Sequence, residues 1–290
     1  MKKAILLLLA FTLVLNTAHA QIKGNKSLLW EISGNGLTSP SYLFGTYHFA
    51  GKNLVDSLSD IKKYFNNCKT VAGEILIDST MTTKLAAYMV FKDSTTLDKI
   101  FTPAEFKLVD DYVKQVTKMN LEDFNLCKPA TVSTILSGFT SPKTVSDTNP
   151  ALDSYFQEEA KRRNYKIIGL ETLEDQAELL FNAPIADQKK DLLESISKKD
   201  KEKIKGEKLY KLYLDQDLDG IEKLMDAEHD TPEQTDKMLK NRNLKWIAEL
   251  PPILKEQPTF VVVGAAHLVG QYGLIKQLRL KGYTLKPVKI

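Results

Sequence analysis

Two histidines of this chain follow the same local pattern. His48 and His267 each come three residues after a glycine, and the apolar runs at residues 42–44 and 260–263 lead directly into those glycines. An apolar run that ends in a glycine turn is typical of a strand that delivers the next side chains to the edge of a sheet. Imidazole acts in such places as a general base or a metal ligand. Because the two patterns lie near opposite ends of the chain, we expect them to build one site in one domain.

Two glutamates have a related setting. Glu74 directly follows Gly73 within an apolar run, and Glu171 comes two residues after Gly169. Sites in open α/β sheets form beyond the carboxyl ends of the strands, so we expect both carboxylates near the imidazoles. A buried carboxylate costs several kcal/mol unless it is paired or ligated. The alternatives are a solvent-facing edge strand for Glu74 and helix capping for Glu171.

Nitrogen and oxygen donors together suit manganese, cobalt, zinc or iron ions. We therefore predict a divalent-metal site with His48, Glu74 and His267 as ligands, each able to reach about 2.0–2.2 Å from one point. Such an ion would acidify water and polarise a carbonyl group. The alternative for each histidine is an ordinary strand-end or helix-capping side chain. The third histidine of the mature chain, His229, lies in a polar stretch and is expected on the surface.

Arg242, Asn243 and Trp246 lie on a predicted helix, with Arg242 and Trp246 one turn apart on the same face. A guanidinium at the mouth of the site would orient a carboxylate or stabilise an oxyanion. The alternative is a surface arginine beside a core tryptophan. The sequence has no His-Glu-x-x-His helix motif, no Gly-x-Ser-x-Gly nucleophile motif and no dinucleotide-binding glycine pattern. Water is therefore the expected nucleophile.

The first twenty residues have the pattern of an export signal. Lys2 and Lys3 precede an apolar stretch at residues 4–15, and Ala18-His19-Ala20 is a small-x-small cleavage site. We expect the mature chain to begin near Gln21, in the periplasm or outside the cell, and to keep no membrane span. The alternative is an uncleaved anchor helix.

The mature chain, residues 21–290, has the length of a single domain. Its 38 basic and 37 acidic residues nearly balance, which argues against nucleic acid or an anionic membrane as the main partner. Cys68 and Cys127 are the only cysteines. They could pair in an oxidising compartment or be two small buried apolar residues.

The apolar periodicity predicts an α/β (α+β) fold, a mixed sheet with helices packed around it and a long helical insertion. The valine-rich strand is expected at the centre of the sheet, because it is apolar on both faces. Strands are predicted at residues 28–32, 42–44, 70–77, 166–170, 260–263 and 283–288, the first two as a hairpin. Helices are predicted at 56–65, 103–116, 151–163 and 268–281, and several within 173–250; the insertion covers about 80–160 and 174–250.

The chain resembles the TraB/GumN family, which is related to the Tiki metalloproteases, over about residues 28–288. The markers stand in order: Leu29-Trp30-Glu31-Ile32, Gly45-Thr46-Tyr47-His48, Glu74, Gly169-Leu170-Glu171-Thr172 with Gln176, Arg242-Asn243 with Trp246, and residues 264–270 with Gly273-Leu274 and Gly282-Tyr283. The resemblance implies metal-dependent peptide hydrolysis. It implies metal or catalytic roles for His48, Glu74 and His267, and substrate-orienting roles for Glu171, Arg242 and Asn243.

The leading hypothesis is therefore an exported, divalent-metal-dependent hydrolase of peptides or proteins. A metal-free hydrolase resembling erythromycin-esterase-type folds is the first alternative, with His48 or His267 as general base and Arg242 stabilising the developing charge. A protein that binds a peptide, a metal ion or haem without turnover is the second alternative.

Overall fold

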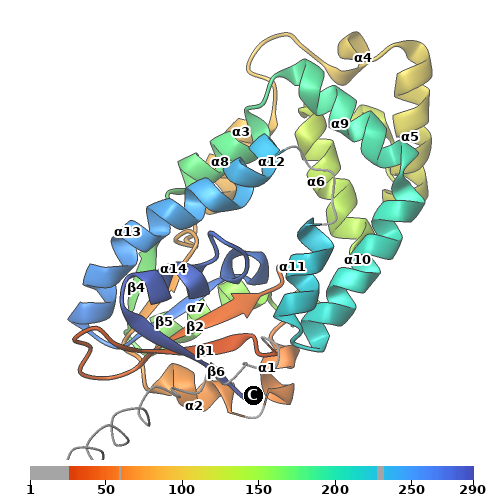
Figure 1. Cartoon of the computed structure of the whole chain (residues 1–290). Coiled ribbons are helices and arrows are strands. Elements are labelled where there is room, and N and C mark those ends of the chain that lie inside the picture. Colours follow the sequence, from red (N-terminus) through yellow and green to blue (C-terminus); the bar gives the residue numbers. More distant parts are fainter. Residues whose placement is uncertain (1–25, 59, 227–231) are drawn as a thin grey trace, which may run out of the picture.

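The computed structural model describes residues 26–58, 60–226 and 232–290 (Figure 1). The predicted export signal and His229 lie outside these residues. No helix in the described part of the chain is both long and apolar enough to cross a membrane.

Six strands form one mixed sheet, as the sequence predicts. Their order is β4 (Lys166–Gly169), β3 (Thr70–Gly73), β5 (Thr259–Gly264), β2 (Ser41–Thr46), β1 (Leu29–Gly34) and β6 (Tyr283–Val288). The first four strands in this order run parallel, whereas β1 is antiparallel to both of its neighbours. All six residues of β5 are buried, and the strand lies between β3 and β2, which confirms its predicted central position.

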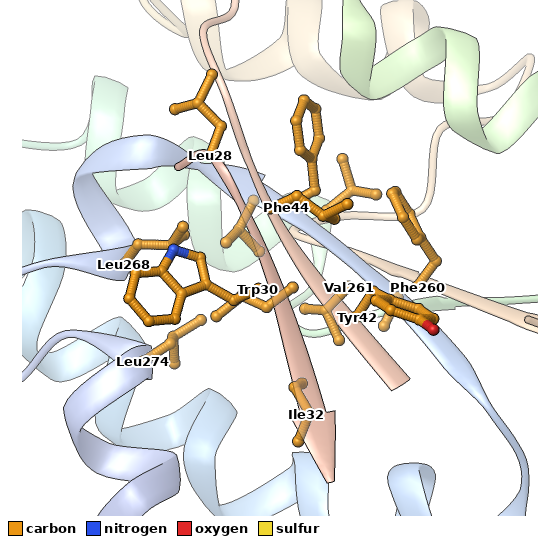
Figure 2. Close-up of a cluster of buried hydrophobic side chains, with 14 of the residues drawn as sticks. Leu28, Trp30, Ile32, Tyr42, Phe44, Phe260, Val261, Leu268 and Leu274 are labelled. Atoms are coloured by element: carbon orange, nitrogen blue, oxygen red, sulfur yellow. The ribbon is translucent and has the colours of Figure 1, made fainter. Parts of the chain in front are cut away.

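The main core covers both faces of this sheet (Figure 2). On one face, Phe44 of β2 and Phe260 of β5 meet Phe156 of α7 (Leu152–Arg162), with ring centroids 5.5 and 5.0 Å away. On the other face, Trp30 of β1 lies under Arg279 of α14 (Leu274–Leu280). Alternate residues of a strand point to opposite faces, so apolar strands can bury both.

A second core holds the helical insertion together. Figure 1 shows α4, α5, α6 and α9 grouped away from the sheet. Their cluster includes Leu97, Val109, Val132 and Leu192. The helices that follow β3 are α3 (Met81–Met89), α4 (Leu97–Ile100), α5 (Pro103–Thr117), η1 (Leu121–Phe124) and α6 (Pro129–Thr140). Those that follow β4 are α8 (Leu173–Phe181), α9 (Ile185–Ser197), α10 (Lys199–Leu214), α11 (Leu218–Asp226), α12 (Pro232–Thr235), the π-helical turn η2 (Asp236–Lys240) and α13 (Asn241–Glu256).

Several predicted boundaries are wrong. The strand predicted at 70–77 ends at Gly73, because the main chain of Ile75 and Ile77 bonds to the side chain of Gln157 instead of to a strand. The helix predicted at 268–281 begins only at Leu274, after Gly270 with φ +83°.

Two further differences concern helices. The predicted helix at 56–65 is two short ones, α1 (Asn53–Ser57) and α2 (Ile61–Asn66). Helix α7, placed in the insertion by sequence, packs on β3 and β5 because Leu152, Phe156 and Ala160 join the main core.

Both cysteines are free. Cys68 is buried in the main core, whereas Cys127 is half-buried within the helical insertion, where its main chain forms an isolated β-bridge with Val90. The structure thus favours the unpaired alternative.

Candidate functional site

The predicted site residues follow four parallel strands at the same edge of the sheet. His48 comes after β2, Glu74 after β3, Glu171 after β4, and His267 lies in the 3-10 turn η3 (Ala265–Leu268) after β5. Because β3 ends at Gly73, Glu74 belongs to the strand end and not to a strand face. Glu74 is only 8% exposed, so it does not face water on an edge strand.

Three of these side chains surround Gly264. A Cβ atom built on Gly264 would lie 3.3 Å from Glu74 Oε1, 3.6 Å from His267 Cδ2 and 3.8 Å from His48 Nε2. The Gly264 N–H also donates to Glu74 Oε1 at 2.8 Å. The absence of a side chain at Gly264 therefore leaves the space between the two imidazoles and the carboxylate open.

Asn243 determines the tautomer of His267. Its Nδ2 donates to the carbonyl oxygens of His267 and Tyr272, at 3.2 and 3.0 Å, so its Oδ1 is the acceptor. That oxygen lies 2.7 Å from His267 Nδ1, which must then carry the hydrogen. The lone pair of the neutral ring is therefore on Nε2. Trp246 packs on the same imidazole, with ring centroids 4.4 Å apart.

Arg242 uses all five of its N–H donors. Nε and Nη2 donate to Glu171, Nη2 also donates to Glu74, and Nη1 donates to the Met238 carbonyl and to His267 Nε2. The Nη2 distances to Glu74 Oε2 and Glu171 Oε1 are both 2.6 Å. The guanidinium thus reaches the site, as predicted, and is shared between two buried carboxylates.

Gln176 links the same two carboxylates. Its Nε2 donates to Glu74 Oε2 at 3.2 Å and to Glu171 Oε1 at 3.1 Å. The resemblance marks Gln176 but implies no role for it. The amide joins the loops after β3 and β4 without adding charge to the cluster.

Asp153 is a site residue that the sequence did not reveal. Its Oδ2 lies 3.2 Å from His48 Nδ1, and its Oδ1 accepts from the Thr46 hydroxyl at 2.8 Å. Asp153 lies in the first turn of α7, where an acidic residue is ordinary, so nothing local distinguishes it.

The buried groups have shifted pKa values. Burial alone would raise the pKa of Glu74, but the neighbouring His267, His48 and Arg242 and the Gly264 N–H lower it to about 2. The pKa of His267 is lowered to about 3, chiefly by burial and also by Arg242 and His48, whereas Glu74 acts to raise it. At neutral pH the pair is therefore an ionised Glu74 and a neutral His267.

The pKa of the exposed His48 imidazole is shifted in the opposite direction from that of His267. The charge and hydrogen bond of Asp153 raise the pKa of His48 to about 9. The His48 side chain is 64% exposed, so water screens this pair and moderates the shift. Burial would lower the pKa of Arg242, but Glu171 and Glu74 raise it.

The chemistry of the donors suits a metal ion, although Arg242 competes for one of them. His48 and His267 both hold Nδ1 against an oxygen, as metal-ligating histidines do. Nε2 of His48 lies beside Gly264, and Nε2 of His267 lies 3.9 Å from Glu74 Oε1. Across residues 26–58, 60–226 and 232–290, no three His, Cys, Asp or Glu side chains are arranged to hold a metal ion. The Arg242 guanidinium lies 3.0 Å from His267 Nε2. A metal at this site stays a prediction.

Fold and site together define an α/β protein with a histidine–carboxylate–arginine cluster at the carboxyl edge of its parallel strands. The chain belongs to the TraB/PrgY/gumN family, which it matches over residues 28–287. No curated protein and no solved structure gave a significant match.

Proposed function

We propose that the protein is a hydrolase of peptides that uses a divalent metal ion held by His48, Glu74 and His267. The observation that carries this proposal is the matched setting of the two imidazoles. Each Nδ1 is bound to an oxygen acceptor, Asp153 or Asn243. His48 Nε2 lies beside Gly264, and His267 Nε2 lies 3.9 Å from Glu74 Oε1, where its present partner is Arg242. A metal-ligating histidine is oriented in this way by an acceptor on its other nitrogen.

The charge of the cluster supports a divalent cation. Glu74, Glu171 and Asp153 are three carboxylates. Among the described residues the permanent cation paired with this set is Arg242, which bonds to Glu74 and Glu171. When His48 is neutral, as a metal ligand must be, two negative charges are left without compensation. A divalent ion carries the opposite charge.

When bound, the metal would supply a Lewis acid that lowers the pKa of water and polarises a carbonyl group. The side chains of the protein have other tasks. Asp153 and Asn243 hold the two rings, and Arg242 pairs with Glu171 and helps to lower the pKa of Glu74. If His267 Nε2 takes another partner, Nη1 of Arg242 loses its acceptor there. This N–H can then donate to a substrate oxygen on which negative charge develops.

A metal-free hydrolase is a second candidate that one specific observation favours. In the structure as it stands, Nε2 of His267 accepts a hydrogen bond from Arg242. His48 instead has an exposed ring that is backed by Asp153. A histidine backed by a carboxylate can act as general base towards water once its ring has lost its proton, and the raised pKa of His48 moves that loss to higher pH.

Metal binding and peptide cleavage separate the two candidates. We suggest measuring the metal content of the purified mature chain, its titration with Zn²⁺, Mn²⁺ and Co²⁺, and cleavage of a broad peptide mixture with and without chelator. The metal hypothesis predicts that chelator stops cleavage and that His267→Ala and His48→Ala each abolish metal binding. His229→Ala is the matched control, because it removes the remaining histidine of the mature chain.

Each other outcome has a definite meaning. Chelator-resistant cleavage that His48→Ala abolishes would support the metal-free hydrolase. Tight retention of a peptide, metal ion or haem without cleavage under any ion would support a binding protein.

We also propose that the protein acts outside the cytoplasm, in the periplasm or beyond the cell. Residues 1–20 have the charged, apolar and small-x-small segments of a cleaved signal. Sequencing the N-terminus of the protein from a cell-envelope fraction should give Gln21; an intact Met1 there would contradict the proposal.

A further inference from the structure

We infer that Asp153 is a positioning residue that fixes the ring orientation and the tautomer of His48, with Thr46 holding the carboxylate in place. The activity part of this inference rests on the proposed function. The tautomer part concerns His48 alone and can be tested without any turnover.

The first support is the way Asp153 is itself held. Thr46, the last residue of β2, is 2% exposed, and its hydroxyl donates to Asp153 Oδ1 at 2.8 Å. This bond occupies one carboxylate oxygen and leaves Oδ2 for His48 Nδ1 at 3.2 Å. The carboxylate thus joins a buried strand end to an exposed ring two residues further along the chain.

The second support is the main-chain connection between the two segments. The loop after His48 bonds to the start of α7 through Lys52 N to the Pro150 oxygen at 2.9 Å and Leu152 N to the Ala50 oxygen at 3.1 Å. Gly51 and Ala151 also form an isolated β-bridge. These bonds fix the position of Asp153 relative to His48 independently of their side chains.

The Asp153 carboxylate determines which nitrogen of His48 carries the hydrogen. An ionised carboxylate only accepts hydrogen bonds, so Nδ1 of His48 must carry the hydrogen. In the neutral ring the lone pair is then on Nε2, which faces Gly264 and Glu74. Within the described parts of the chain, Asp153 is the one hydrogen-bond partner of the His48 ring. An unrestrained imidazole in water favours the opposite tautomer, so the presence of Asp153 decides where the lone pair lies.

The direct test is imidazole ¹⁵N NMR of His48, recorded above the pH at which the ring loses its proton. The wild type should show the Nδ1–H form, and Asp153→Ala should shift the ring to the Nε2–H form. Asp153→Asn should keep much of the Nδ1–H form, because an amide oxygen still accepts. Thr46→Val should give a partial shift, since it frees the carboxylate to move.

Peptide cleavage provides the second readout. Asp153→Ala should lower kcat about 10- to 100-fold, with KM changed much less, because the carboxylate is inferred to act through the His48 ring. Asp153→Asn should recover part of this loss. Glu159→Gln is the matched control on the same helix, since Glu159 pairs with Arg162 and Arg163 and should leave both readouts unchanged.

The two proposals fail in different ways. An Nδ1–H ring in Asp153→Ala as in the wild type would overturn the inference, even with an active enzyme. If the predicted tautomer shift occurs but the wild type cleaves nothing, the inference about Asp153 holds and the proposed hydrolase activity is wrong. Unfolding curves of all variants should show that each is folded at the temperature of measurement.

Discussion

Nη1 of Arg242 lies 3.0 Å from Nε2 of His267, so a buried guanidinium donates to the lone pair that a metal ion would need. The same guanidinium holds Glu74 and Glu171 at 2.6 Å. Arg242 therefore stabilises the carboxylates of the site and at the same time competes with a metal ion for one ligand. This competition makes the variants of Arg242 and its neighbours informative.

Replacement of Arg242 by Met should destabilise the fold strongly. Glu74 and Glu171 would stay buried without their cation, which costs about 3–5 kcal/mol for a broken buried pair. Urea unfolding at pH 7 measures the loss. Lys245→Met is the matched control, because Lys245 lies on the same helix as Arg242 and its exposed pair with Asp175 of α8 contributes about 0–1 kcal/mol. Equal losses in the two variants would contradict the structural role assigned to Arg242.

Replacement of Gly264 by Ala should weaken activity and metal binding but keep the fold. Gly264 has φ −54° and ψ 139°, which alanine adopts freely, so the backbone is not strained. The new methyl group would instead lie 3.3 Å from Glu74 Oε1, within the space that the two imidazoles share. Metal titration and peptide cleavage should both weaken at least about tenfold, as when groups that orient metal ligands are changed. Gly138→Ala is the control, since nothing lies within 4 Å of its added Cβ. Wild-type activity in Gly264→Ala would show that the space beside Gly264 is not needed for metal binding or cleavage.

The stability of the fold should fall in acid partly because of His267. Its folded pKa is lowered to about 3 from the usual 6.5. Between these pH values the His267 imidazole is protonated in the unfolded chain but not in the folded chain. The free energy of unfolding therefore decreases as the pH falls. One such proton gives a slope of about 1.4 kcal/mol per pH unit. Chemical unfolding between pH 6.5 and 4 should show a shallower slope for His267→Gln, and parallel slopes would disprove the pKa shift.

Both cysteines should be present as thiols in the purified mature protein. The structure leaves Cys68 and Cys127 free, and burial raises the pKa of Cys68 to about 12. A thiol reagent should therefore react slowly with Cys68 in the folded protein and with both residues after unfolding without reductant. A single thiol-free, intramolecularly oxidised species would show that the pairing alternative is correct.

The sequence determined the elements and the edge at which the site forms. The apolar run at 260–263 predicted a central strand, and each glycine after an apolar run predicted a strand end with an ionisable side chain beyond it. These features depend on residues within a few positions of each other, because strand burial and turn formation are local properties of the chain. His48, Glu74, Glu171 and His267 could therefore be identified before the fold was known.

Only the tertiary structure decided how those side chains are paired. Asp153 meets His48 across 105 positions of sequence, and Arg242 reaches Glu74 across 168. No local pattern distinguishes an acidic residue in a first helical turn that meets an imidazole from one that meets water. The early end of β3 also depends on tertiary structure, because the side chain of Gln157, on α7, forms hydrogen bonds with the main chain of Ile75 and Ile77. Hydrogen bonds between distant segments exist only after packing has brought their donors and acceptors together, so the fold and not the local sequence determines them.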